Sequence, residues 1–227
     1  MPGLQRLDAR PPTRVFLVDD HPLVREWLAN LIKQQPDLTV CGEADGVDEA
    51  LVRIPGAKAD VAVVDLSLGG RSGLDLIREL AQRHPSTSVL VLSMHEEELY
   101  AERALRAGAR GYVMKREVTG NVIAGIRRVA QGEIFISGRL STLLAEKLIA
   151  GAPRAQESPV SRLSDRELEV FELLGRGLAT RQIADSLHVS AKTVQSFCAR
   201  IKEKLGLASS TELLRAAIHW LEERGAE

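Results

Sequence analysis

The first 131 residues alternate between short apolar segments and helical segments, and this alternation constrains the fold more than any other feature. The segments of strand length are Val15–Val18, Thr39–Glu43, Val61–Asp65, Ser88–Ser93 and Gly111–Met114. The segments with helical spacing are Leu23–Lys33, Asp48–Ile54, Leu74–His84, Glu97–Ala107 and Asn121–Gln131. Five strand–helix units in a row are typical of a doubly wound parallel sheet with helices on both faces. The strands are continuous runs of Val and Leu, which fits a sheet buried on both sides.

The alternation stops after the fifth unit, so a second domain is expected. The stretch "GEIFISGRLSTLLAEKLIAG" predicts a short extended piece and one further helix. "APRAQESPVS" is rich in Ala, Pro, Ser and charge and predicts a linker. Only helical patterns follow it. We therefore expect a flexible N-terminus over 1–13, an α/β domain over 14–133, a linker with a short helix over 134–160, and a small all-α domain over 161–227.

Composition and cysteine usage exclude several classes of protein. The longest apolar runs, such as "DVAVVDLSL", are far shorter than a membrane span, and the first thirteen residues lack the apolar core of a signal peptide. A cytoplasmic protein without a membrane partner is expected. Cys41 and Cys198 lie far apart and have no ligand-spaced partners, so zinc and disulfide readings are disfavoured.

Polar side chains come at the ends of four predicted strands. Asp19 and Asp20 follow the first strand, Asp65 ends the third, Ser93 ends the fourth and Lys115 follows the fifth. The carboxyl ends of parallel strands meet at one edge of the sheet, where ligands bind. Two carboxylates about 4 Å apart repel by roughly 4 kcal/mol at an effective dielectric near 20, so a compensating cation is expected. An acidic, oxygen-rich site suits Mg²⁺, and a carboxylate beside it can attack a phosphoryl donor.

Residues 14 to about 133 resemble the receiver domain of bacterial two-component response regulators. The resemblance is carried by "VDD", "VVDLSL", "LSM" and "GYVMK", in family order and spacing. It implies a flavodoxin-like (CheY-like) five-stranded receiver fold and a sensor histidine kinase as partner. It also implies that Asp65 is the phosphoacceptor, that Asp20, Asp65 and the backbone carbonyl of Ser67 hold Mg²⁺, and that Asp19 acts mainly through metal-bound water.

The resemblance assigns three further residues and also shows one departure. Ser93 and Lys115 would bind the phosphoryl group, and Tyr112 would be a rotating aromatic switch, although Tyr112 is also readable as a core aromatic. The family often has Met-Pro-Gly after the acceptor segment, where this chain has Leu68-Gly69-Gly70. Without the proline we expect a more mobile loop and an altered phosphoryl lifetime.

An enzyme acting on an external substrate is disfavoured. Aspartyl-phosphate hydrolases of the haloacid dehalogenase type need a second Asp two residues after the nucleophile, and here that position is Ser67. No G-x-G-x-x-G follows the first strand, which disfavours dinucleotide binding. At most, Mg²⁺-dependent self-phosphorylation from a phosphodonor and slow self-dephosphorylation are expected.

The C-terminal helical pattern predicts a helix-turn-helix. Ser164 and Glu167 form a capping-box pattern that starts a first helix. A helix from about Thr180 to Leu187, a short turn and a helix opened by Ser190 follow. The second of these helices has its core positions at Val194, Phe197, Ile201 and Leu205 and its outward positions at Lys192, Gln195, Ser196, Ala199 and Lys202. Six basic residues face two acidic ones between 176 and 204, which allows a weak basic surface.

This segment resembles the LuxR-type helix-turn-helix of the NarL/FixJ response regulators, through "LSDREL", "GRGLATRQIADSLHVSAKTV" and "KEKLGL". The resemblance implies that the second helix enters the major groove of double-stranded DNA. The residues it places at the DNA are Lys192, Thr193, Gln195 and Ser196, with Arg181 and Arg200 at phosphates.

Departures in the recognition helix keep a second hypothesis open. Gln195, Phe197 and Ala199 stand where relatives often have basic, amide or histidine side chains, and fewer cations weaken DNA binding. The first hypothesis is a transcriptional regulator controlled by phosphorylation of Asp65, which forms a homodimer on DNA or on phosphorylation. Apolar residues on the last helix, such as Leu214 and Ile218, favour that dimer. The alternative is a phosphorylation-dependent protein-interaction module whose helix-turn-helix does not read DNA.

Overall fold

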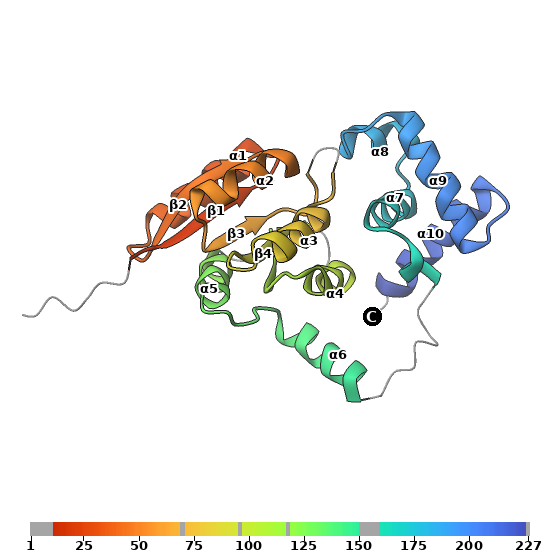
Figure 1. The fold of residues 1–227 in the computed structure, drawn as a ribbon. Coiled ribbons are helices and arrows are strands. Elements are labelled where there is room, and N and C mark those ends of the chain that lie inside the picture. Colours follow the sequence, from red (N-terminus) through yellow and green to blue (C-terminus); the bar gives the residue numbers. More distant parts are fainter. Residues whose placement is uncertain (1–10, 69–70, 95–96, 117–118, 150–158, 226–227) are drawn as a thin grey trace, which may run out of the picture. The chain divides into compact units, whose positions relative to one another are not determined.

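A computed structural model describes residues 11–68, 71–94, 97–116, 119–149 and 159–225 (Figure 1). It divides into two compact units, Met1–Ser141 and Thr142–Glu227, and each is considered by itself. The expected flexible N-terminus falls largely on residues 1–10, and most of the stretch "APRAQESPVS" within the expected linker falls on 150–158; both lie outside the described residues. Among the residues that the structure describes, no helix has the length and apolar character needed to cross a membrane.

The first unit contains one five-stranded parallel sheet. Its strands are β1 (Thr13–Val18), β2 (Leu38–Ala44), β3 (Val61–Val64), β4 (Ser88–Ser93) and β5 (Gly111–Met114). Their order is β2-β1-β3-β4-β5, and all four pairings are parallel. The strand order reverses at β1 and β3, which is where ligands bind in such sheets. The predicted doubly wound fold is confirmed.

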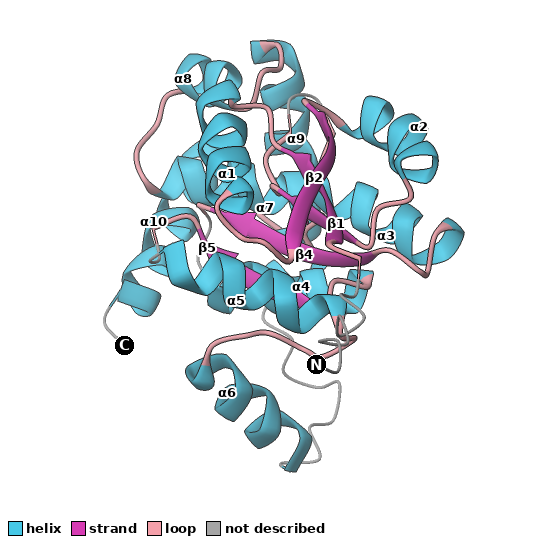
Figure 2. Cartoon of the chain, turned by 90° about the vertical axis from the view of Figure 1, so that its left-hand side faces the viewer, coloured by secondary structure: helices cyan, strands magenta, loops and turns pink. Residues whose placement is uncertain are grey.

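Helices cover both faces of this sheet (Figure 2). They are α1 (Pro22–Lys33), α2 (Val47–Ala57), α3 (Gly73–Arg83), α4 (Glu97–Ala107) and α5 (Thr119–Ala130). Leu28 and Ile32 of α1 share one buried cluster with Ile126 and Val129 of α5, so these two helices lie on the same face. The helices α2, α3 and α4 contact one another in sequence order, which accounts for the opposite face.

The loop after β3 is held tightly against the strand end. Ser67 and Ser72 form an isolated antiparallel bridge, and the Gly73 N–H donates to the Leu66 carbonyl at 2.8 Å. A Cβ at position 73 would lie 2.1 Å from the Asp65 carbonyl oxygen, so only glycine fits there. The Ser72 hydroxyl then accepts the Leu74 N–H and caps α3. This local geometry fixes the position of Asp65.

The predicted extended piece and further helix after α5 are both present. Phe135 forms an isolated parallel bridge with Gly111 of β5, and α6 spans Gly138–Ile149.

The second unit is entirely helical in the part that the structure describes. A 3-10 turn, Pro159–Arg162, precedes α7 (Asp165–Gly175), α8 (Thr180–Ser186), α9 (Ala191–Leu205) and α10 (Ser210–Gly225). The predicted capping box is present at Ser164 and Glu167. The Phe171 and Trp220 rings pack with their centroids 5.5 Å apart and join α7 to α10. The short turn between α8 and α9 completes the predicted helix-turn-helix.

Candidate functional site

An acidic cluster lies at the carboxyl-end edge of the sheet in the first unit. Asp19 and Asp20 follow β1, and Asp65 follows β3. Together with His21, each offers one ligand atom, and these atoms all lie within 4.8 Å of one another. Asp19 is 2% exposed and Asp65 is 4% exposed. Two neighbouring strand ends therefore bring three carboxylates to one place.

Lys115 bridges two of these carboxylates. Its ammonium lies 2.7 Å from Asp19 Oδ2 and 2.7 Å from Asp65 Oδ2, and its side chain is largely buried. Burial and the neighbouring Asp19 raise the pKa of Asp65, while Lys115 opposes that rise. Burial alone would lower the pKa of Lys115, but the two carboxylates outweigh it and raise that pKa. The three carboxylates carry more negative charge than the one ammonium neutralises, so the cluster could bind a further cation.

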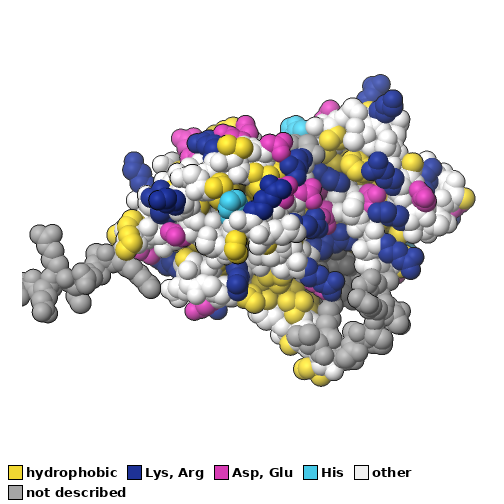
Figure 3. All heavy atoms as spheres, viewed as in Figure 1, with side chains coloured by type: hydrophobic (Ala, Val, Ile, Leu, Met, Phe, Trp, Pro, Cys, Tyr) yellow, Lys and Arg dark blue, Asp and Glu magenta, His cyan; other side chains and the backbone are white. Residues whose placement is uncertain are grey.

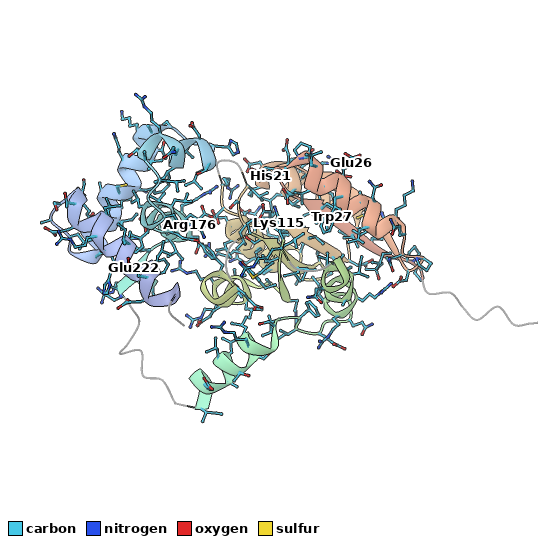
Figure 4. The ribbon with its side chains drawn as sticks, turned by 180° about the vertical axis from the view of Figure 1, so that it is seen from behind. His21, Glu26, Trp27, Lys115, Arg176 and Glu222 are labelled. Carbon is cyan, nitrogen blue, oxygen red and sulfur yellow. The ribbon has the colours of Figure 1, made fainter. Side chains whose placement is uncertain are left out.

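His21 joins the cluster, and the sequence analysis did not single it out. Its backbone N–H donates to Asp19 Oδ1 at 2.9 Å, and its Nδ1 lies 2.7 Å from Asp20 Oδ1. Figure 4 labels His21, which precedes α1, and Lys115, which follows β5. The available signal was the position of His21 directly after the two acids in "DDH".

The other predicted residues of this edge lie on β3, β4 and β5 or directly after them. Ser67 is half-buried in the loop after β3, while Ser93 ends β4 and is completely buried. The Ser93 carbonyl accepts the Lys115 N–H at 2.8 Å, which places the two strand ends side by side. Tyr112 is 2% exposed in the middle of β5. Gly69 and Gly70, on which the expected loop mobility depends, lie outside the described residues.

The predicted DNA-reading face is presented by α8 and α9. Ser190 caps α9, because its hydroxyl accepts the Thr193 N–H at 3.0 Å. Val194 and Ile201 are buried as expected, whereas Phe197 and Leu205 are only half-buried. The candidate contact residues are exposed at Arg181, Lys192, Gln195, Ser196 and Arg200 and half-buried at Thr193.

Two contacts shape the exposed surface of α9. The Ser196 hydroxyl donates to the Lys192 carbonyl at 3.0 Å, and the Arg200 guanidinium lies 6.0 Å from the centre of the Phe197 ring. In Figure 3, Lys and Arg side chains are scattered over the visible face of the helical unit. Exposed basic side chains are thus present on this unit without forming one continuous patch on the visible face.

Comparison with known proteins gives the family. Residues 15–127 match the family described as "Response regulator receiver domain", and residues 161–217 match "Bacterial regulatory proteins, luxR family". The chain is 38% identical over 200 residues to the DNA-binding transcriptional activator DevR/DosR of Mycobacterium tuberculosis, covering 88% of this chain and 91% of that protein. The chain is a response regulator of the NarL/FixJ family.

Solved structures agree with this assignment of the regulator. RcsB from Salmonella enterica serovar Typhimurium, bound to promoter P1flhDC in the presence of phosphomimetic BeF₃⁻, is 28% identical with a TM-score of 0.58, over 90% of this chain and 98% of that one. A structure of two RcsB dimers bound to two parallel DNAs is 27% identical with a TM-score of 0.55, over 90% and 97%. The regulator thus combines a receiver domain with a LuxR-type DNA-binding domain, and it is a DNA-binding transcriptional regulator.

Proposed function

We propose that Asp65 accepts a phosphoryl group from a sensor histidine kinase or a small donor, and that this modification controls DNA binding by the helix-turn-helix. The single observation that carries the proposal is the placement of a buried Asp65 carboxylate against Lys115, at 2.7 Å, within a cluster of acids. A buried carboxylate that pairs with a cation at the end of a strand is a candidate reactive group. Folding of the sheet alone does not require a carboxylate at that position.

The donor set fits Mg²⁺. Three carboxylates converge from two strand ends, and hard oxygen ligands are the ones that Mg²⁺ prefers. We assign direct coordination to Asp20, Asp65 and the Ser67 backbone carbonyl, and contact through bound water to Asp19. When bound, Mg²⁺ would neutralise charge on the phosphoryl oxygens. Asp20→Ala is expected to lower Mg²⁺ affinity in calorimetric titration, while Asp75→Ala, at a half-buried acid of α3 that pairs with Arg78, is not; equal affinities would contradict the assignment.

The residues around Asp65 have separate roles in the transfer. A carboxylate oxygen of Asp65 forms a bond to phosphorus, and the bond from phosphorus to the donor atom breaks, with its electron pair leaving on the donor. Lys115 offsets the charge on the phosphoryl oxygens, and the Ser93 hydroxyl donates a hydrogen bond to one of them. Tyr112 repacks when Ser93 moves toward the phosphoryl group. The same site supports self-phosphorylation and slow self-dephosphorylation, without turnover of an external substrate.

The reading surface lies on α9 and its neighbour α8. Lys192, Thr193, Gln195 and Ser196 face the base edges and adjoining backbone, and Arg181 and Arg200 contact phosphates. The exposed positions of five of these six residues support this assignment. Lys192, Thr193, Gln195 and Ser196 lie within the first six residues of α9, the end of a recognition helix that reaches the bases in helix-turn-helix proteins.

Dimer formation supports DNA binding by a weakly basic domain. Leu214 is 41% exposed and Ile218 is 37% exposed, one turn apart on α10. Pairing of two copies would bury this face and raise the effective concentration of the second recognition helix on DNA. We expect the regulator in the cytoplasm, where its DNA would lie. We assign the receiver to 14–133 and the DNA-binding domain to 161–227.

The deciding experiment is capture of genomic fragments by the purified regulator, with and without a phosphoryl donor and Mg²⁺. Donor-dependent enrichment of a two-fold-related sequence is expected, and Asp65→Asn should lose it while Asp75→Asn keeps it. Equal enrichment with and without the donor would show that phosphorylation of Asp65 does not control DNA binding. No enrichment in any state would favour the protein-interaction module.

A further inference from the structure

A segment beyond the receiver helices occupies the free edge of the sheet. The Phe135 N–H donates to the Arg110 carbonyl at 2.9 Å, and the Phe135 carbonyl accepts the Tyr112 N–H at 2.9 Å. β5 is the last strand of the sheet, so these bonds engage backbone groups at its outer edge. Residues 133–137, here called the β5 latch, therefore attach directly to the strand that carries Tyr112.

Side chains hold the β5 latch in place. The Phe135 ring sits over Gly125 of α5, where an added Cβ would come within 3.0 Å of a ring carbon. The Arg128 guanidinium lies 5.6 Å from the centre of that ring and forms an ion pair with Glu133 at 2.7 Å. Gly125 leaves space for the Phe135 ring and Arg128 packs over it, which indicates a specific packing site for this side chain and not an incidental contact.

The C-terminal end of the β5 latch is tied to α4 by one carboxylate. Ser137 caps the N-terminus of α6, because its hydroxyl accepts the Leu140 N–H at 3.1 Å and its carbonyl accepts the Ser141 N–H at 3.0 Å. The Ser137 N–H itself donates to Glu97 Oε1 at 2.9 Å. A negative charge is favourable at the N-terminus of a helix, so Glu97 stabilises α6 where it leaves the receiver.

Glu97 is also close to the phosphorylation site along the chain. It is the first residue of α4, four residues after Ser93. A cavity of about 210 Å³ beside this contact is lined by Glu97, Tyr112, Asn121, Phe135, Ile136 and Ser137. Tyr112, to which the family resemblance gives the switch role, is bonded directly to the β5 latch, and Ser93, which it assigns to the phosphoryl group, is four residues before Glu97. The cavity leaves space for side chains to repack.

We propose that the hydrogen bond from Ser137 to Glu97 closes the β5 latch, and that phosphorylation opens it. The opening step rests on the proposed function of Asp65. When Ser93 is drawn to the phosphoryl group, the start of α4 shifts and the Glu97 carboxylate leaves the Ser137 N–H. The open state lacks one charge-assisted bond, which the phosphoryl contacts offset, so the population moves toward it. The start of α6 is then released from α4, and the β5 latch keeps its contacts through Phe135.

Amide hydrogen exchange of the full chain measures the latch directly. In unmodified protein, Glu97→Ala should speed exchange of the Ser137 amide about tenfold, because a bond to a charged acceptor is lost. The Phe135 amide should follow, while core amides such as that of Val63 do not change. Glu97→Gln keeps an acceptor and should restore most of the protection. Glu102→Ala, on the same helix and paired with Arg106, is the matched control.

The second arm compares wild type with and without Mg²⁺ and beryllofluoride, a phosphoryl mimic, beside Asp65→Asn. Faster exchange at Ser137 and Phe135, absent in Asp65→Asn, is expected. Unchanged exchange in a sample phosphorylated by a small donor and verified by intact mass would overturn the latch and leave the Asp65 assignment standing. Failure of phosphoryl uptake would overturn the Asp65 assignment and the opening step with it. Protection at Ser137 that Glu97→Ala leaves intact would overturn the closing contact itself.

Discussion

The Lys115 ammonium lies 2.7 Å from the Asp65 carboxylate, a contact between residues fifty positions apart in the sequence. The same ammonium lies 2.7 Å from Asp19, so one buried cation joins the ends of three strands. This bridge fixes the relative positions of the side chains in the proposed phosphorylation site. It also makes the site sensitive to changes in charge, which can be measured.

Removal of the acceptor carboxylate should abolish modification. Asp65→Asn cannot form the acyl phosphate, so incubation with acetyl phosphate and Mg²⁺ should add no phosphoryl mass to the intact protein. Asp75→Asn, at a half-buried acid of α3 that pairs with Arg78, should be modified like the wild type. Uptake by Asp65→Asn at the wild-type rate would show that another group is the acceptor.

Removal of the bridging cation should destabilise the receiver and favour metal binding. Lys115→Ala leaves Asp19 and Asp65 buried without their shared partner, and breaking such a contact costs about 3 kcal/mol of unfolding free energy. Added Mg²⁺ should restore part of that loss and bind more tightly than to the wild type, because the site is more negative. Urea unfolding across a Mg²⁺ titration checks both effects. Equal Mg²⁺ affinity in the two proteins would contradict this account of the charge balance.

The helical domain should lose stability in acid through Glu167. Burial opposes the charged form, but the hydrogen bonds from Lys204 at 2.6 Å and the Ser164 N–H at 2.7 Å outweigh it and lower the pKa of Glu167. A group with a lowered native pKa stabilises the fold above its ordinary value of 4.5 and loses that contribution as the pH falls below it. Glu167→Gln should therefore lower the free energy of unfolding by about 1 kcal/mol at pH 7. It should also make the unfolding free energy less dependent on pH below pH 4.5.

The fluorescence of Trp220, which packs on Phe171 in the helical domain, reports this unfolding in a Trp27→Phe background. If the unfolding free energy falls as steeply with pH in Glu167→Gln as in the parent protein, Glu167 is not the source of the acid sensitivity.

A glycine should stabilise the receiver at one helix end. Lys58 caps α2 with φ 47° and ψ 50°, a left-handed conformation that costs a side chain with a Cβ about 1–2 kcal/mol. Lys58→Gly should raise the unfolding free energy by about 0.5–1 kcal/mol after the entropy of glycine is counted. Lys58→Ala removes the charge but keeps the Cβ, so it should bring no gain. Urea midpoints followed by Trp27 in a Trp220→Phe background make the comparison, and equal effects of the two substitutions would point to charge.

Two neighbouring positions on α9 should affect DNA binding differently. Lys192→Ala should weaken binding about equally on all DNA sequences, as expected for a phosphate contact. It should also reduce the salt slope, which is the slope of the logarithm of the binding constant against the logarithm of the salt concentration, by about one. Gln195→Ala should cost about 1–3 kcal/mol at one base pair and relax the preference there. Lys33→Ala, an exposed lysine of the receiver, carries the same charge change and should leave the salt slope unaltered. Binding that neither α9 substitution alters would place the reading surface elsewhere.

The sequence by itself determined the order and kind of the elements. Apolar runs of strand length and helical spacing are local patterns, so all five strands, the five receiver helices and the capping box at Ser164 could be predicted to within a few residues. Strand ends are equally local, which is why Asp19, Asp65 and Lys115 could be expected at one edge of a parallel sheet. The strand order was not needed for that inference.

Tertiary structure alone decided which groups touch. The bridge of Lys115 to both Asp19 and Asp65, the approach of His21 to Asp20 and the seat of Phe135 on β5 depend on strand order, register and loop closure. Phe197, expected in the core, is only half-buried and lies 6.0 Å from the Arg200 guanidinium, which helical spacing alone does not indicate. These features join parts of the chain whose local patterns are independent of one another, and only the folded arrangement sets the distances over which charges and hydrogen bonds act.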